Sequence, residues 1–133
     1  MLQTLTVRTG SHTEFLDLTG RIQAAVQESG VQDGLCHLFV PHTTAAVTIN
    51  ENADPSVRAD ILMVLNKLIS EREPYRHLEG NSPAHIKASL LGPQLTLMVS
   101  GGRLVLGTWQ GIFFCEFDGP RNRRLHLKMV ADR

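Results

Sequence analysis

The fold class is decided by the stretch Leu95-Thr-Leu-Met-Val-Ser-Gly-Gly-Arg-Leu-Val-Leu106. Two short runs of strand-forming residues flank Ser100-Gly101-Gly102, which we interpret as a tight turn, because glycine adopts the positive φ that short hairpin loops require. The residues that follow repeat the pattern, so the last third of the chain predicts an antiparallel meander. Its four expected strands are Leu95–Val99, Arg103–Leu106, Thr108–Phe117 and Arg124–Val130.

Upstream of this meander, strands and helices mix without the regular βαβ order of a doubly wound sheet. Alternating or strand-forming residues predict strands at Leu2–Arg8, Leu35–Val40 and Ala46–Ile49. Apolar side chains at helical spacing predict helices that run to Ser29, Ile69 and Leu90, with Thr19, Asp54 and Ser82 as their N-caps. The sequence therefore predicts an α+β fold, an antiparallel β-sandwich-like sheet with two or three helices.

The composition is that of one neutral globular domain. The chain has 133 residues, 42% of them hydrophobic, and 13 Lys and Arg balance 13 Asp and Glu. Such a chain buries a substantial core, so we expect a single domain over residues 1–133. Zero formal charge argues against nucleic-acid or membrane binding through a long-range field, and no apolar run approaches the ~20 residues that span a bilayer.

The N-terminus and the cysteines indicate a location. The first residues lack the basic and apolar regions of a signal peptide, so we expect a cytoplasmic protein. Cys36 and Cys115 both lie in apolar stretches, which favours two reduced, buried thiols over a disulfide framework.

Three histidines, His42, His77 and His85, each lie beside turn-forming residues. Neutral imidazole is a common zinc ligand, and catalytic sites often use three protein ligands with one position open. The spacing is not a zinc signature by itself, because Gly80 and Pro83 interrupt any continuous helix between His77 and His85. The alternative is a polar strand end for His42 and hydrogen-bonded loop positions for the other two.

Two further polar clusters contain residues that have alternative roles. Glu51, at the end of an expected strand, is a general base, a partner for a metal-bound histidine or a solvated turn acid. Arg121, after a Gly-Pro turn, holds a phosphate or pairs with Asp118 or Glu116. Trp109 is a core or interface residue, or a platform for stacking.

At these residues the sequence resembles the YjbQ-like family of secondary thiamine-phosphate synthases. The resemblance covers nearly the whole chain. It is carried by motifs that follow in order: His42-Thr-Thr-Ala-Ala-Val-Thr-Ile-Asn-Glu-Asn-Ala-Asp-Pro55, Tyr75-Arg-His77 with Glu79-Gly-Asn81 and Ala84-His-Ile-Lys87, Gly102-Arg-Leu104 with Leu106-Gly-Thr-Trp-Gln-Gly-Ile112, and Glu116-Phe-Asp-Gly-Pro-Arg121.

The resemblance implies an α+β fold with a β-sandwich, a homotrimer, and a pocket near the histidine motifs that binds a metal such as zinc. It favours His42, His77 and His85 as the metal ligands. The activity that it implies joins hydroxymethylpyrimidine diphosphate to hydroxyethylthiazole phosphate and releases pyrophosphate. Small phosphorylated metabolites are therefore the expected partners, and magnesium is an alternative ion with the diphosphate.

We assign expected roles to the residues of these motifs on that basis. A divalent ion, Arg121 and helix amides near Ser82 would neutralise the leaving pyrophosphate, and Trp109 would shield the cationic fragment from water. Glu51, His42 and Asn81 are the expected catalytic residues. The expected substrate-binding residues are Thr43, Ser82, Trp109, Gln110 and Arg121.

Two other function classes fit the same residues. The first is a metal-dependent hydrolase of a small phosphorylated or acyl substrate, with Glu51 as base toward a metal-bound water. The second is a non-catalytic protein that binds a phosphorylated metabolite, in which the histidines and Arg121 only recognise an anion.

Overall fold

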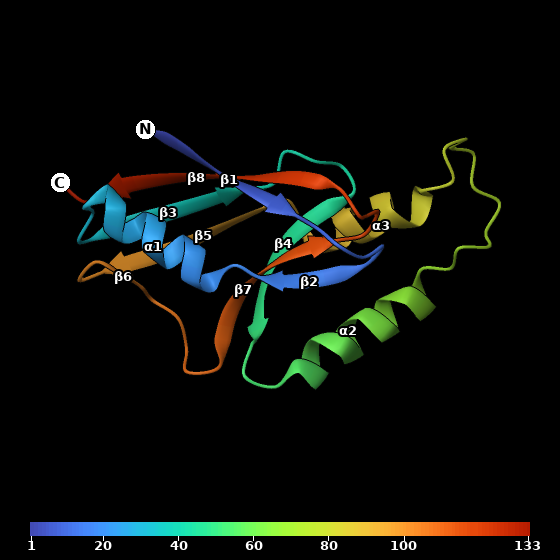
Figure 1. The fold of residues 1–133 in the computed structure, drawn as a ribbon, viewed down its shortest axis with the longest axis horizontal. Coiled ribbons are helices and arrows are strands. Elements are labelled where there is room, and N and C mark those ends of the chain that lie inside the picture. Colours follow the sequence, from blue (N-terminus) through green and yellow to red (C-terminus); the bar gives the residue numbers. More distant parts are fainter.

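The computed structural model describes all 133 residues, Met1–Arg133, as eight strands and three helices (Figure 1). In chain order these are β1 (Leu2–Arg8), β2 (Glu14–Asp17), α1 (Thr19–Ser29), β3 (Gly34–Phe39), β4 (Ala45–Glu51), α2 (Pro55–Leu68), α3 (Ser82–Leu91), β5 (Gln94–Ser100), β6 (Arg103–Leu104), β7 (Gln110–Glu116) and β8 (Asn122–Ala131). The mixed α+β architecture with antiparallel sheets that the sequence predicts is confirmed.

The strands form two antiparallel sheets of different size. The large sheet has the order β1-β8-β3-β5-β6, and the small sheet has the order β2-β7-β4. The inner face of the large sheet packs on α1 and on one face of the small sheet. This contact is the main core, which includes Val26 of α1, Leu38 of β3 and Phe114 of β7.

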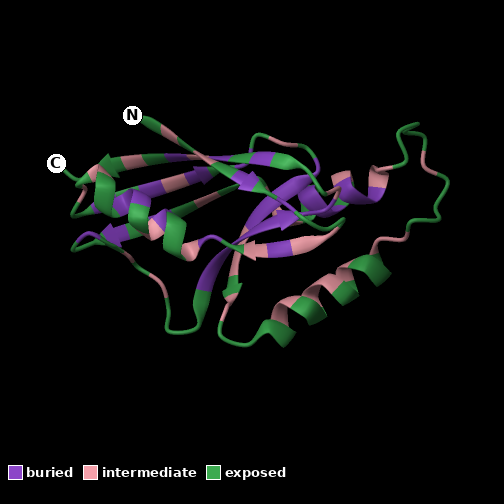
Figure 2. Cartoon of the chain, viewed as in Figure 1, coloured by how far each residue is buried: buried purple, intermediate pink, exposed green.

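The other face of the small sheet is covered by α3 and α2. A second core there joins Phe15, Phe113 and Phe117 to Ala84 and Ala88 of α3. The small sheet is thus buried on both faces, whereas the outer face of the large sheet has no covering layer within the chain (Figure 2).

The predicted meander is wrong beyond its first hairpin. Gly101 and Gly102 have φ of 59° and 76° and join β5 to β6, as expected. The chain then crosses to the small sheet, where β7 is the central strand, and β8 returns to the large sheet between β1 and β3. The physical reason is that residues 111–115 of β7 are apolar and buried on both faces, which suits a strand enclosed between two layers.

Three local expectations also need correction. The strand β2 was not predicted, because four residues give too short a pattern. Thr19 does not cap α1: the N-cap is Leu18, and the Thr19 hydroxyl donates to Asp17 and accepts the N–H of Ile112. Ser82 lies inside α3, whose N-cap is Asn81. Asp54 does cap α2 as predicted, since its carboxylate accepts the N–H of Ser56.

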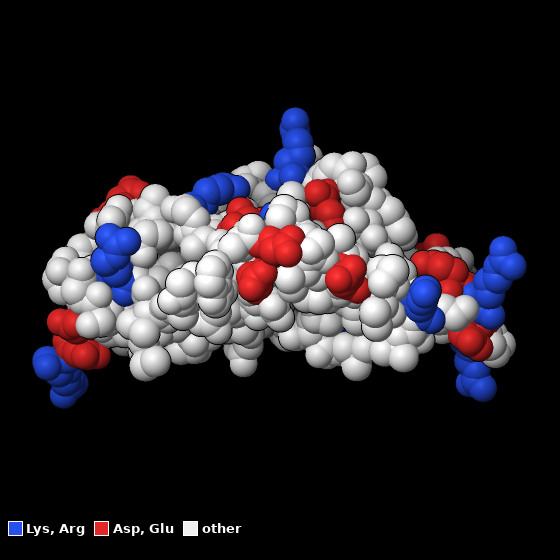
Figure 3. Space-filling model, turned by 90° about the horizontal axis from the view of Figure 1, so that it is seen from below, with Lys and Arg blue, Asp and Glu red and all other residues white.

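The helix α2 is the least buried of the three helices (Figure 2). None of its residues is fully buried, and Val64 and Leu68 of its apolar stripe are 54% and 70% exposed. No helix is both long and apolar enough to cross a membrane. The face seen in Figure 3 carries acidic side chains near its middle and most of its Lys and Arg toward its ends, so charge of both signs is spread over it.

Both cysteines are free and buried, as the sequence predicts. Burial raises the pKa of the Cys36 thiol to about 11 and raises that of Cys115 well above its ordinary value. The two residues therefore act as core side chains, and neither is an activated thiol.

Candidate functional site

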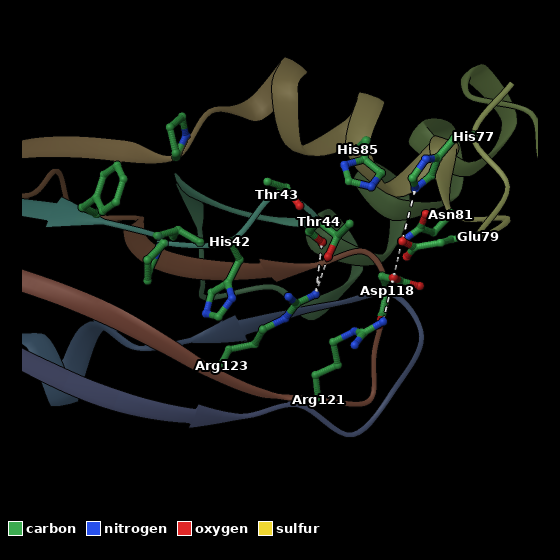
Figure 4. A pocket seen from close by; sticks show the side chains of 14 residues that line it. His42, Thr43, Thr44, His77, Glu79, Asn81, His85, Asp118, Arg121 and Arg123 are labelled. Carbon is green, nitrogen blue, oxygen red and sulfur yellow. Dashed lines mark hydrogen bonds and ion pairs between the residues drawn. The ribbon is translucent and has the colours of Figure 1, made fainter. Parts of the chain in front are cut away.

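A polar pocket of about 610 Å³ opens where β4 begins and β7 ends (Figure 4). It brings together the loop after β3, the first turn of α3 with the loop before it, and the loop between β7 and β8. Only two of its 14 lining residues are hydrophobic. The residues with functional groups are His42, Thr43, Thr44, His77, Glu79, Asn81, His85, Asp118, Arg121 and Arg123. Its size and polarity suit a small polar ligand.

The floor of the pocket is a buried ion pair between Arg123 and Glu116. Both side chains are at most 5% exposed, and the Arg123 Nε donates to Glu116 Oε1 at 2.9 Å. Thr9 donates a further hydrogen bond to the same carboxylate, and Arg123 donates to the Thr44 hydroxyl. Burial alone would raise the pKa of Glu116, but these hydrogen bonds outweigh it and hold the pKa below its usual value.

Sequence reasoning missed Arg123, although a signal existed. In β8 the residue alternates in register with Leu125 and Leu127, which are both fully buried, so its side chain points into the core. A charged residue at an inward position requires a buried partner. Of the two partners that the sequence offered for Arg121, Asp118 or Glu116, the structure gives it Asp118, and Glu116 pairs with Arg123.

His42 lies on the β8 side of the pocket, held by one specific hydrogen bond. Its Nε2 accepts the backbone N–H of Arg124 at 2.9 Å. Burial and the neighbouring Arg123 lower its pKa, so the ring is neutral near pH 7. A neutral ring whose Nε2 is an acceptor carries its proton on Nδ1. His42 is therefore arranged as a hydrogen-bond donor toward the pocket.

His77 and His85 form a pair on the opposite side of the pocket (Figure 4). Their ring centroids are 5.2 Å apart and the rings are nearly perpendicular, at 88°. His85 is carried by the first turn of α3, and His77 by the preceding loop, where its Nε2 lies 3.9 Å from a carboxylate oxygen of Glu79. Both histidines line the same pocket as His42.

Asn81 provides a polar atom that lacks a partner. Its Nδ2 donates to Asp118 Oδ2 at 2.9 Å, whereas its Oδ1 is buried without any hydrogen-bond partner. A buried carbonyl oxygen left unpaired costs about 1–3 kcal/mol. The position therefore suits a ligand that donates a hydrogen bond, or a cation.

The start of α3 offers fewer free amides than the sequence suggests. The N–H groups of Ala84 and His85 both bond to the carbonyl of Asn81, and Pro83 has no N–H. The expected anion contact through helix amides near Ser82 is therefore weak. Ser82 itself lines an adjoining depression with Tyr75, His77, His85 and Ile86.

Arg121 forms an ion pair with Asp118, which was one of the two roles that the sequence allowed; the other was to hold a phosphate. Its Nη2 lies 3.0 Å from Asp118 Oδ2, and its Nε donates to the Asp118 carbonyl at 2.7 Å. Half of the Arg121 side chain stays exposed at the pocket. The guanidinium thus retains free N–H groups for a ligand, but Asp118 offsets its charge.

Glu51, Trp109 and Gln110 do not line this pocket. Glu51 pairs with Gln110 at the other end of the β4–β7 ladder, and the six residue steps from Ala45 to Glu51 span about 20 Å. Trp109 lies beside them, with its carbonyl bonded to the N–H of Asn52. Within one chain, the predicted site residues are therefore divided between two ends of the small sheet.

The metal prediction has mixed geometric support. No three His, Cys, Asp or Glu side chains of one chain are grouped so that they could hold an ion. His77 and His85 are close together, but His42 uses its unprotonated nitrogen for the Arg124 amide. The set of His42, His77 and His85 as joint metal ligands stays a prediction.

The chain is similar to proteins from bacteria and archaea over its full length. The sequence model of the family described as "UPF0047 protein YjbQ-like" matches residues 3–132. UPF0047 protein MJ1081 of Methanocaldococcus jannaschii is 50% identical over all of this chain and 96% of its own length. UPF0047 protein YugU of Bacillus subtilis is 48% identical over 98% of this chain and all of its own length.

Solved structures agree with this assignment. The crystal structure of an uncharacterised conserved protein of the YjbQ/UPF0047 family from Clostridium acetobutylicum matches with a TM-score of 0.94 at 50% identity, and covers 96% of this chain and 99% of its own. A hypothetical protein from Aeropyrum pernix K1 matches with a TM-score of 0.94 at 37% identity, over 99% of each chain. The protein with this α+β fold and histidine-lined pocket belongs to the YjbQ-like UPF0047 family.

Proposed function

We propose that the pocket is the active site of a transferase for small phosphorylated metabolites, and that a divalent ion, zinc first, binds at His77 and His85. The observation that carries the proposal is the pair of imidazoles 5.2 Å apart beside the unpartnered Oδ1 of Asn81. Nitrogen and oxygen donors of this kind suit zinc. When bound, such an ion supplies positive charge for a phosphate group.

The charges of the pocket support this proposal, because they leave a bound phosphate group without a free positive charge. Arg123 is paired with Glu116, and Arg121 with Asp118, so neither arginine contributes a free positive charge. His42 is neutral near pH 7. A diphosphate would meet hydrogen-bond donors but little net charge, and a divalent cation corrects this deficit.

The chain's own side chains have defined roles in this proposal. The His42 Nδ1–H, the free N–H groups of Arg121 and the Thr43 hydroxyl donate hydrogen bonds to phosphate oxygens. Asn81 holds Asp118 in place through its amide nitrogen. The reaction that we propose is the coupling of hydroxymethylpyrimidine diphosphate to hydroxyethylthiazole phosphate, in which the bond to pyrophosphate breaks as the thiazole nitrogen attacks the carbon.

We also propose a homotrimer, as the family resemblance implies. The outer face of the large sheet supports association, since Phe39, Met98 and Leu35 are 47%, 61% and 36% exposed on it. Exposed apolar side chains that adjoin one another on a sheet are typical of an interface.

The test of the proposed function is a coupling assay on untagged protein, with and without chelator. We expect thiamine phosphate and pyrophosphate to form in equal amounts, and chelator or His85→Asn to reduce the rate at least tenfold. The matched control is His37→Asn, whose imidazole bonds to Thr96 on the outer sheet face. Turnover that chelator leaves unchanged would contradict the role of the ion. If the two precursors raise the melting temperature but no product forms, the result would contradict the transferase and support a non-catalytic protein that binds a phosphorylated metabolite.

In a single chain, the alternative function of a metal-dependent hydrolase lacks its expected general base at the pocket. Glu51, its proposed base, lies about 20 Å along β4 from the pocket. Release of inorganic phosphate or pyrophosphate without a coupled product would support the hydrolase instead of the transferase.

A further inference from the structure

The small sheet presents two polar ends, and each is incomplete alone. The pocket at one end has the histidines and the arginines. Glu51, Trp109 and Gln110 gather at the other end, about 20 Å away along β4. This second end has no pocket of its own among the principal cavities.

Trp109 is an exposed residue in an ordered turn. Its side chain is 62% exposed, and it is the only tryptophan of the chain. Hydrogen bonds fix the backbone around it: its carbonyl accepts the N–H of Asn52, and the side-chain oxygen of Gln110 accepts the N–H of Gly107. A large aromatic side chain that the backbone holds in solvent is typical of the centre of an interface.

The outer face of the large sheet reaches from the pocket mouth across β3 and β5. Phe39 lines the pocket and also lies on this face, and Leu35 pairs with Met98 further along it. The five strands of this sheet contain no Asp or Glu. Arg124 and Lys128 of β8 alternate with the buried Leu125 and Leu127, so they lie on the outer face and make it basic as well as apolar.

The Trp109 end has the opposite charge. Glu51 ends β4 and Asp54 caps α2 directly after it, while Asp17 bonds to Asn52 between them. Figure 3 shows acidic side chains grouped near the middle of the face that looks toward the β6–β7 loop and α2. An acidic end with an exposed tryptophan complements a basic face with exposed apolar side chains.

This complementarity selects the way in which two copies associate. A two-fold contact centred on the large sheet would place the basic face on a second basic face, which is unfavourable. A head-to-tail contact joins unlike surfaces, and it closes into a ring when the rotation between copies divides a full turn, as it does in the homotrimer proposed above. We propose that the Trp109 end of one copy docks on the large sheet of the next at Phe39, so that Trp109 and Glu51 complete the neighbour's pocket. The inference rests on the proposed function only for the location of the site.

In the assembly that we propose, the indole of Trp109 covers the pocket mouth against Phe39 and excludes water. Glu51 then lies close enough to act on a ligand held by the neighbour's histidines. The predicted site residues, which one chain divides between two ends, thereby come together across the contact.

Crosslinking tests this contact without reference to any reaction. Phe39→Cys and Trp109→Cys are prepared separately, mixed in equal amounts, allowed to exchange, and treated with a short bis-maleimide. The native Cys36 and Cys115 are both buried and so do not react. We expect crosslinked dimers in the mixture and none in either variant alone, and the double variant should yield a closed covalent ring that migrates as a trimer.

The matched control is Val64→Cys mixed with Phe39→Cys, because Val64 is exposed on α2 to a similar extent, 54%. Leu35→Cys with Val105→Cys is a second pair if Trp109→Cys disturbs the fold. A folded mixture that gives no crosslink would overturn the proposal, and so would crosslinks within each single variant, which indicate contact between like surfaces. Because no substrate enters, failure here is distinct from failure of the transferase.

Discussion

Glu116 and Arg123 form the charged pair on which the pocket floor depends. The carboxylate accepts from Arg123, from Thr9 and from the N–H of Asp118, so no lone pair is left for a ligand. This residue is therefore structural, although it begins the motif Glu116-Phe-Asp-Gly-Pro-Arg121. It positions Arg123 and, through the adjacent Arg124 amide, His42.

Removing the charge of Glu116 should be costly. We expect Glu116→Gln to lower the free energy of unfolding by about 3–5 kcal/mol at pH 7, because it leaves a buried guanidinium without its counter-ion. Urea unfolding measures the difference, with Glu28→Gln on the exposed surface of α1 as the control. A loss of less than about 1 kcal/mol would mean that water reaches Arg123.

The same pair should contribute to acid sensitivity. The folded-state pKa of Glu116 lies below its ordinary value, so the unfolded chain binds the proton more readily. The stabilisation is fully present above about pH 4.5 and is lost as the pH falls through the lowered pKa. The free energy of unfolding, measured between pH 7 and pH 3, should fall less steeply with decreasing pH for Glu116→Gln than for the native chain. An equal slope in the two proteins would assign the acid sensitivity to other carboxyl groups.

At the scale of elements, the sequence predicts what local chemistry determines. The strand β1 has the bounds that were predicted and the helix α1 ends where it was predicted to end, because alternation and the left-handed Gly30 define these limits locally. Which sheet β7 joins depends on the layers that pack on both faces of the strand, and no local sequence pattern carries that information. The site depends on strand pairing as well: Ala45 of β4 pairs with Glu116 of β7, which brings His42 and Arg121 to one pocket, and the same ladder carries Glu51 to its opposite end. Only His77, Asn81 and His85 are close in sequence, so their proximity is the part of the site that a local pattern predicts.

The strand pairing of β3 with β8 depends on Gly34. A Cβ at this position would lie 2.0 Å from the carbonyl oxygen of Val130, and backbone cannot move aside. We expect Gly34→Ala to destabilise by more than about 2 kcal/mol, measured by thermal unfolding. The control is Gly20→Ala in α1, where no atom lies within 4 Å and a gain of about 0.5–1 kcal/mol is expected. Equal effects of the two substitutions would contradict the register.

Lys87 joins the helix α3 to α2 through a long buried side chain. It is 2% exposed, its Nζ donates to Asn66 Oδ1 at 2.7 Å, and burial lowers its pKa. If its methylene stem rather than its charge matters, Lys87→Met should change the free energy of unfolding by less than about 1 kcal/mol, while Lys87→Ala should cost about 2–4 kcal/mol. An equal loss in both variants would show that the ammonium is required.

At the scale of the whole molecule, the chain places unlike surfaces at opposite ends. Local signals reveal the apolar strands, but they do not distinguish a core face from an outer face such as that of β3 and β5. The uncovered sheet face, the exposed apolar stripe of α2 and the exposed Trp109 are features that we expect of a chain that associates with other copies, as in the homotrimer that we propose.

The single tryptophan tests the proposed assembly. We expect the emission of Trp109 to move to longer wavelength on dilution, because in the proposed contact a neighbouring copy covers the indole and dissociation would expose it. Sedimentation at the same concentrations should show the change in mass. An emission maximum that is independent of concentration while the mass changes would place Trp109 outside the contact.

Zinc binding by histidine variants tests the central claim, that the pocket holds a divalent ion at His77 and His85. We would titrate zinc by calorimetry into the native chain, His77→Asn, His85→Asn and His42→Gln, in which the Gln oxygen can still accept the Arg124 N–H. We expect tight binding by the native chain and by His42→Gln, and an affinity at least tenfold lower for His77→Asn and His85→Asn. An equal loss in His42→Gln would favour a site with three histidines, and absence of zinc binding by the native chain would contradict a metal site at His77 and His85.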